Sequence, residues 1–275
     1  MALVPFRGQS TVPAVRAEGE DEDSEMAAGR MSFLEHLEEL RRRIIYSLVA
    51  LLGGFLISFL FIRRIFDFIM EPLYALLPKG GPLANTLVYS EPTEAFVLYL
   101  KMALLTGIMI AAPFILYQVW AFVAPGLYAR EKKFAIPFIG LGSICFVLGA
   151  VFSHYVLFPW TWQFLASFST DYLAFLPRIE PVFSLYTKML LGMGLIFQMP
   201  TVVFFLARVG VVSARFLVRH FKYAVLVIFV VAALITPTGD PLTQALFAAP
   251  MVGLYLISIG IAWLVGRRRP KGEAA

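Results

Sequence analysis

The stretch YQVWAFVAPGLYAREKK, residues 117–133, ends one long apolar run, turns, and meets the next apolar run at a basic cluster. Pro125 and Gly126 predict the turn, because proline presets φ and glycine tolerates a reversal. The aromatic side chains suit the headgroup region of a bilayer, where an amphipathic ring is satisfied at both ends. One carboxylate, Glu131, lies inside the basic cluster. The stretch therefore predicts a short cytoplasmic loop that is either an interfacial anchor or a receptor for a cationic ligand.

The composition indicates an all-α, polytopic integral membrane protein. Of the 275 residues, 60% are hydrophobic and 15% are charged, whereas soluble domains are about half apolar and a quarter charged. The net charge of +5 does not indicate nucleic acid as a partner, because the basic residues are spread over separate short segments. The single cysteine, Cys145, excludes an intramolecular disulfide.

Six apolar runs predict six transmembrane helices, at residues 44–62, 95–120, 134–158, 182–206, 223–235 and 242–265. The fifth run gives a helix of roughly 20 Å, which is short for a hydrocarbon core of ~30 Å. The turn that follows, at residues 236–241, is therefore expected to lie below the outer surface of the bilayer. Residues 63–94 are rich in proline and predict a short interfacial helix after the first span.

The segments that flank the spans divide the chain into three parts. Residues 1–30 carry an acidic run and no apolar signal-peptide core, which predicts a disordered tail. Ser32 and Glu35 form a capping-box pattern that predicts the start of an amphipathic helix leading into the first span. Residues 31–266 are expected to form the six-helix domain, and residues 267–275 a basic tail.

Positive charge is concentrated on alternate connections between the predicted spans. Fourteen Lys and Arg residues lie on the presumed inner flanks and four on the outer segments. By the positive-inside rule, both termini are predicted to be cytoplasmic.

Reactive residues are sparse and scattered along the sequence. The three histidines are far apart and lack a metal-binding spacing, so neither a metal site, a cofactor nor an enzymatic activity is expected. Lys101 and Lys188, each near a span's outer end, indicate snorkelling or, as the lesser alternative, an ion path. Gln118 and Gln198 should face protein or water, and Pro200 predicts a break in span four beside Gln198. A secondary transporter is the rival class, but the two halves show no inverted repeat.

Two acidic positions remain as candidate binding sites. They are the Glu38 and Glu39 pair in HLEELRRR and Glu131 in YAREKK. A carboxylate can accept the planar fork of an arginine in bidentate fashion, so acids on two inner segments could bind two arginines of a partner. The alternative is that these acids only pair with neighbouring Arg or Lys side chains.

Several motifs resemble the twin-arginine translocase C subunit (TatC) family. They are HLEELR at 36–41, EPL at 71–73, AP at 112–113, YQVWAFVAPGL at 117–127, FP at 158–159 and TP at 236–237. The resemblance covers about residues 32–265 and includes all six spans in order.

The resemblance implies a receptor and core subunit of the machinery that exports folded proteins across the bacterial inner membrane. It implies twin-arginine signal peptides as ligands, single-span subunits of the TatA and TatB type as partners, a homo-oligomer within the complex, and the proton-motive force as the energy source. By motif match, the peptide-binding residues would be Glu39, Glu131, Arg41 and Phe122. Pro72, Gln198 and Asp240 match positions associated with partners or with polar groups in the membrane. The family often has Glu at the position of Gln198, so a hydrogen-bonding role is expected here.

Overall fold

The computed structural model describes residues 18–74, 87–89, 91–123, 135–168, 177–236 and 240–266, without the side chains of 18–33, 123 and 135–139. The chain divides into two compact units, Met1–Ile44 and Ile45–Ala275. The described residues are almost entirely helical, with one isolated bridge between Val88 and Arg178. The all-α prediction is therefore confirmed.

Helix α1 runs from Glu18 to Leu60 without a break, a length of 43 residues. The prediction that Ser32 opens this helix is wrong, because Ser32 lies inside it. Acidic residues stabilise the positive end of the helix dipole, so the acidic run that starts at Glu18 suits the beginning of a helix as well as it suits a disordered tail. The amphipathic lead-in and the first span thus form one continuous helix.

The long apolar runs all form helices. They are α3 (Glu94–Val123), α4 (Ala135–Phe152) with its continuation η3 (Ser153–Leu157) and α5 (Phe158–Ala166), α6 (Ile179–Ile196) with α7 (Met199–Val209), and α10 (Pro241–Val265). Together with the second half of α1, these make five helical segments among the described residues that are long and apolar enough to cross a membrane. The predicted spans are confirmed to within a few residues at most ends, except that the third continues to Ala166.

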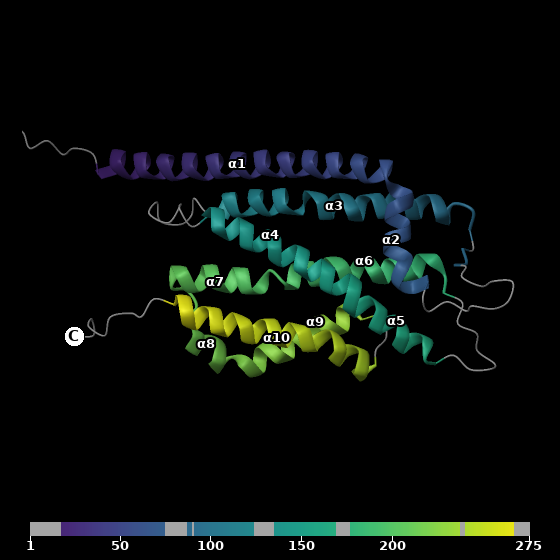
Figure 1. Ribbon diagram of the computed structural model, residues 1–275. Helices are drawn as coiled ribbons and strands as arrows, with labels where there is room; N and C mark the ends of the chain where they lie inside the picture. Colours follow the sequence, from purple (N-terminus) through teal and green to yellow (C-terminus); the bar gives the residue numbers. More distant parts are fainter. Residues whose placement is uncertain are drawn as a thin grey trace, which may run out of the picture. The chain divides into compact units, whose positions relative to one another are not determined.

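The shorter helices lie at the two ends of the Ile45–Ala275 unit. Helix α2 (Ile62–Tyr74) is the predicted interfacial helix, and it buries Ile69, Met70 and Leu73. Figure 1 shows α2, α5 and the beginning of α6 at one end of the unit, while α8 (Ala214–Arg219) lies with the ends of α7 and α10 at the other. This arrangement separates the predicted outer connections from the predicted inner ones.

Close packing between the long helices depends on glycine. A Cβ at Gly54 in α1 would lie 2.6 Å from the carbonyl oxygen of Gly107 in α3, and one at Gly149 in α4 would lie 2.6 Å from that of Met193 in α6. Small residues of this kind let transmembrane helices approach backbone to backbone. The glycine contacts thus bring α1 close to α3 and α4 close to α6. Helix α4 also packs against α3, and Figure 1 shows α4 running at an angle to its neighbours.

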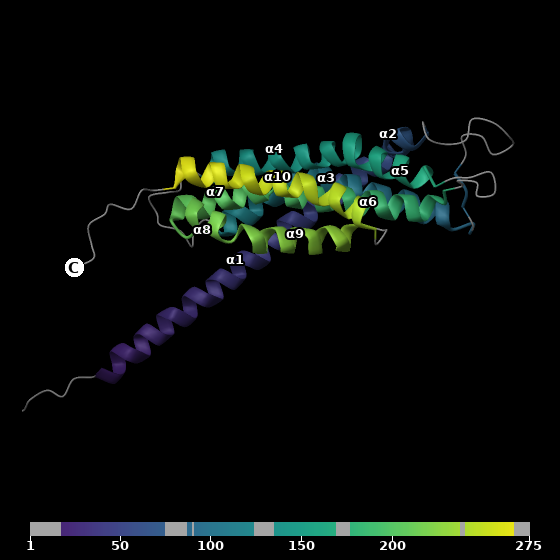
Figure 2. The same cartoon turned by 90° about the horizontal axis from the view of Figure 1, so that it is seen from below.

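Helix α9 (Phe221–Ile235) is the short fifth span that the sequence predicts. Its 15 residues give a length of roughly 22 Å, against a hydrocarbon core of ~30 Å. It packs against α10, and in both Figure 1 and Figure 2 the junction of these two helices stops short of the end where α6 begins. Residues 237–239 of the turn lie outside the described residues, so its depth in the bilayer stays a prediction.

Candidate functional site

Glu39 lies in α1, within the first unit, and already binds an arginine. Its Oε1 atom accepts hydrogen bonds from Arg43 Nη2 at 2.6 Å and from Arg43 Nε at 3.1 Å. The Glu39 side chain is 33% exposed, and its pair with Arg43 is the i,i+4 contact predicted as the alternative to ligand binding. Arg41 lies on the same helix and is exposed. The carboxylate is thus accessible, and its local geometry fits a guanidinium.

The central loop supplies the other predicted binding residues. Phe122 is half-buried near the C-terminal end of α3, in the second unit. The nearby Trp120 ring packs against Phe205 of α7 at 5.1 Å between centroids, which fixes this end of α3. Glu131 lies outside the described residues, so its role stays a prediction.

Gln198 occupies the break between α6 and α7, where the sequence places it. Its side chain is buried, and Nε2 donates a hydrogen bond of 2.8 Å to the carbonyl oxygen of Gly142 in α4. Gly142 makes this contact possible, because a Cβ there would lie 3.2 Å from Gln198 Oε1. Among the described residues, that same Oε1 atom has no hydrogen-bond partner. The expectation that Gln198 faces a protein neighbour is confirmed, with one amide oxygen left over.

A groove of about 550 Å³ lies next to this break. Its walls come from the end of α6 and from α7, α9 and α10, and Gln198, Met199 and Tyr255 are among the residues that line it. Its α9 wall is apolar and includes Val227, which is 58% exposed. The groove therefore combines an open apolar surface with a buried amide.

The structure describes both Asp240 and Pro72, and they lie on different helices. Asp240 caps α10, since its Oδ1 accepts a hydrogen bond of 2.8 Å from the backbone N–H of Thr243. Gln244 Nε2 then donates to the carbonyl oxygen of Phe229, which joins α10 to α9. Pro72 lies inside α2 and is half-buried. Asp240 therefore lies at the start of α10, whereas Pro72 lies in α2.

Two polar contacts of the structure were not predicted from the sequence. Lys101 pairs with Glu180 of α6 at 3.1 Å, so the cation that suggested snorkelling has a charged partner. His154 is buried and its Nδ1 lies 3.1 Å from the hydroxyl oxygen of Tyr186. Glu180 and Tyr186 are far in sequence from Lys101 and His154, so a local pattern does not predict these pairs. The sequence shows only that each of the latter two is a polar residue in an apolar run. No group of three or more His, Cys, Asp or Glu side chains that could hold a metal ion occurs among the residues that the structure describes.

Comparison with known proteins gives a consistent result. The family model of TatC, the Sec-independent protein translocase protein, matches residues 35–250. The TatC protein of Koribacter versatilis is 45% identical over 264 residues, which cover 95% of each chain. The TatC protein of Helicobacter pylori strain J99 is 41% identical over 230 residues, covering 84% of this chain and 88% of its own.

Solved structures agree with these matches. A crystal structure described as the twin-arginine translocase receptor TatC superposes with a TM-score of 0.73 at 35% identity, and the match covers 84% of this chain and 100% of the other. A second crystal structure, of TatC in the detergent DDM, gives a TM-score of 0.73 at 34% identity. The fold and the sequence therefore point to the same family.

Proposed function

The chain belongs to the TatC family of Sec-independent protein translocases, and from this we propose that it is the receptor for twin-arginine signal peptides. Membership makes it a component of a translocase complex, a transport protein and not a conventional enzyme. Its apolar helices agree with a multi-pass protein of the inner membrane. In the proposed role, the protein binds the signal peptide of a folded cargo protein and begins its export.

The observation that carries this proposal is the contact between Glu39 and Arg43. Glu39 Oε1 accepts two N–H groups of the Arg43 guanidinium, which supports this carboxylate as an acceptor for an arginine of a ligand. An exposed i,i+4 pair is worth only about 0.3–0.5 kcal/mol, so an arginine of a peptide can replace Arg43 at small cost. Glu131 would bind the second arginine of the peptide, and Phe122 and Arg41 are the further proposed binding residues.

We propose that both termini are cytoplasmic, which puts the peptide-binding residues on the side where cargo folds. The support comes from the distribution of charge. Arg208, Arg215 and Arg219 belong to α7 and α8, at the end of the unit opposite α2 in Figure 1. The positive-inside rule assigns the more basic end to the cytoplasm.

Single-span subunits of the TatA and TatB type are the proposed partners in this complex, together with further copies of this chain. The groove beside α9 suits a transmembrane helix, because its walls are largely apolar and the polar side chain of Gln198 is among the residues that line it. Support for the proton-motive force as the energy source comes from the family resemblance alone.

Replacement of Gln198 tests the partner part of the proposal. Gln198→Leu is expected to weaken retention of a single-span subunit by about threefold, since a membrane hydrogen bond contributes about 0.6 kcal/mol on average. Gln198→Glu keeps a side-chain oxygen as acceptor but loses the N–H donor to Gly142, so it tests the acceptor separately from that internal hydrogen bond. Co-purification of the two subunits from detergent measures the effect. Unchanged retention in the leucine variant would mean that the amide serves only the contact with Gly142.

A photo-crosslinking experiment tests the receptor function. A photoreactive amino acid placed beside the arginine pair of a signal peptide should crosslink to this chain in inverted membrane vesicles, and the same amino acid in a Lys-Lys peptide should crosslink much less. Right-side-out vesicles should give no product, because the proposed surface is cytoplasmic. A product of equal yield with both peptides, or with both vesicle orientations, would contradict the proposal.

A further inference from the structure

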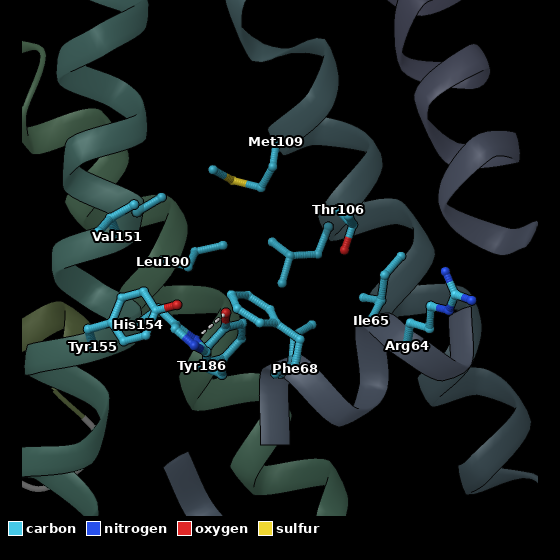
Figure 3. Close-up of a pocket in the computed structure, with 13 residues that line it drawn as sticks. Arg64, Ile65, Phe68, Thr106, Met109, Val151, His154, Tyr155, Tyr186 and Leu190 are labelled. Atoms are coloured by element: carbon cyan, nitrogen blue, oxygen red, sulfur yellow. Dashed lines mark hydrogen bonds between the residues drawn. The ribbon is translucent and has the colours of Figure 1, made fainter. Parts of the chain in front are cut away.

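A cavity of about 330 Å³ lies between α2, α3, η3 and α6, all within the Ile45–Ala275 unit. Its size falls in the range of small-molecule sites, roughly 300–1,000 Å³. Figure 3 shows its lining, in which apolar side chains such as Met109 and Leu190 surround a few polar groups. None of these residues belongs to the proposed peptide-binding surface or to the groove beside α9.

The polar groups on one side of the cavity are His154 and Tyr186. His154 is 3% exposed, and its Nδ1 is 3.1 Å from the Tyr186 hydroxyl, the contact drawn as a dashed line in Figure 3. The ring of Phe68 from α2 stacks on the imidazole at 4.4 Å between centroids. These contacts hold the ring in place, but His154 Nε2 is buried and has no hydrogen-bond partner in the described part of the chain.

The position of His154 depends on an irregular turn. Residues Ser153–Leu157 form a π-helix between α4 and α5. A π-turn inserts one extra residue and rotates the following side chains, and such turns are frequent at functional sites. A buried polar atom without a hydrogen-bond partner is unfavourable, as His154 Nε2 is here. A ligand that has a polar group next to an apolar group would suit both this atom and the apolar lining of the cavity.

A cation lies on the other side of the cavity. Arg64, near the start of α2, lines it and is exposed, and in Figure 3 Phe68 lies between Arg64 and His154. The opening passes residues that are themselves open to the surroundings, since Tyr155 is 60% and Val151 45% exposed. In a membrane protein, an apolar cavity with such an opening is in contact with lipid.

We propose that this cavity binds an anionic phospholipid. The phosphate group pairs with Arg64, an ester oxygen or its bridging water bonds to His154 Nε2, and one acyl chain fills the space beside Met109 and Leu190. A phospholipid combines these three chemistries within one molecule, and a guanidinium suits the phosphate geometry. The proposal does not depend on peptide recognition, because it uses none of the proposed peptide-binding residues.

Native mass spectrometry of the purified full-length chain tests the proposal, with equal amounts of phosphatidylglycerol and phosphatidylcholine added. We expect the protein to retain phosphatidylglycerol about tenfold better, a difference of about 1.4 kcal/mol. Arg64→Gln should remove most of that preference. Arg63→Gln is the matched control, since it removes the same charge from the adjacent exposed position, which does not line the cavity. Equal preference in wild type and Arg64→Gln would overturn the assignment.

Two further measurements distinguish a lipid site from a simple anion site. Val151→Trp places a large ring at the exposed opening and should reduce retention of both lipids, while thermal unfolding shows that the fold is kept. Glycerol 3-phosphate has the charge without the acyl chains, and it should not displace phosphatidylglycerol. If it displaces the lipid, or if Val151→Trp retains lipid as wild type does, the acyl-chain assignment is wrong.

Discussion

Replacing Gly149 by alanine is expected to lower the free energy of unfolding by about 1–3 kcal/mol, the usual cost of overpacking a tight contact. The added methyl group would lie 2.6 Å from the carbonyl oxygen of Met193 and 2.9 Å from the ring of Phe197. The first of these is backbone, so α4 and α6 must separate. Phe197 precedes Gln198, and the separation should also lengthen the hydrogen bond from Gln198 to Gly142.

Gly140 provides the matched control on the same helix. A Cβ at Gly140 has no neighbour within 4 Å, and alanine is favoured over glycine in a helix by about 1 kcal/mol. Gly140→Ala should therefore leave stability unchanged or raise it. Unfolding of both variants in the same detergent measures the difference. Equal stability of the two variants would show that α4 and α6 are not in close contact at Gly149.

The second large effect concerns peptide recognition. Glu39→Gln and Glu131→Gln are each expected to weaken binding of an Arg-Arg signal peptide by tenfold to hundredfold. A charge-assisted hydrogen bond that lipid headgroups and the bound peptide partly shield from water contributes about 1.5–3 kcal/mol, more than the accessible pair of Glu39 with Arg43. Glutamine keeps the shape and one acceptor, so the loss reports the charge. Glu35→Gln removes the same charge one turn away on α1, where the side chain is exposed, and should have little effect.

Isothermal titration of the detergent-solubilised protein with the peptide measures these affinities. Arg130, Lys132 and Lys133 repel a cationic peptide, so the absolute affinity of the wild type should rise with moderate salt while the preference for Arg-Arg falls. A loss of the same size in Glu35→Gln would mean that the net charge of the surface, and not a specific contact, attracts the peptide.

The sequence predicts the elements that depend on local pattern. Apolar runs locate the spans, the 15-residue α9 is recognisable as too short, and Pro200 marks the break beside Gln198. These features follow from hydrophobicity and from the missing N–H of proline, which are properties of neighbouring residues. The candidate site residues are predicted by short motifs shared with the family. One of them, Glu131, lies outside the described residues.

The features that the sequence does not predict depend on tertiary contacts. His154 pairs with Tyr186, 32 residues away, and Lys101 with Glu180, 79 residues away. The π-turn at Ser153–Leu157 has no composition signal, because its residues also suit an ordinary helix. The capping pattern at Ser32 and Glu35 predicts that α1 starts at Ser32, but the helix begins at Glu18. A capping pattern is only a tendency, so it does not exclude a helix that starts earlier.

A double-mutant cycle in peptide binding tests the central claim most directly. Glu131→Gln and Glu39→Gln are each combined with Arg→Gln at either consensus arginine of the ligand, and the four affinities of each cycle give the coupling energy. Direct contact predicts a coupling energy of about 1.5–3 kcal/mol between each acid and one particular arginine. A coupling energy near zero at both acids, for both arginines, would contradict the receptor assignment of these residues.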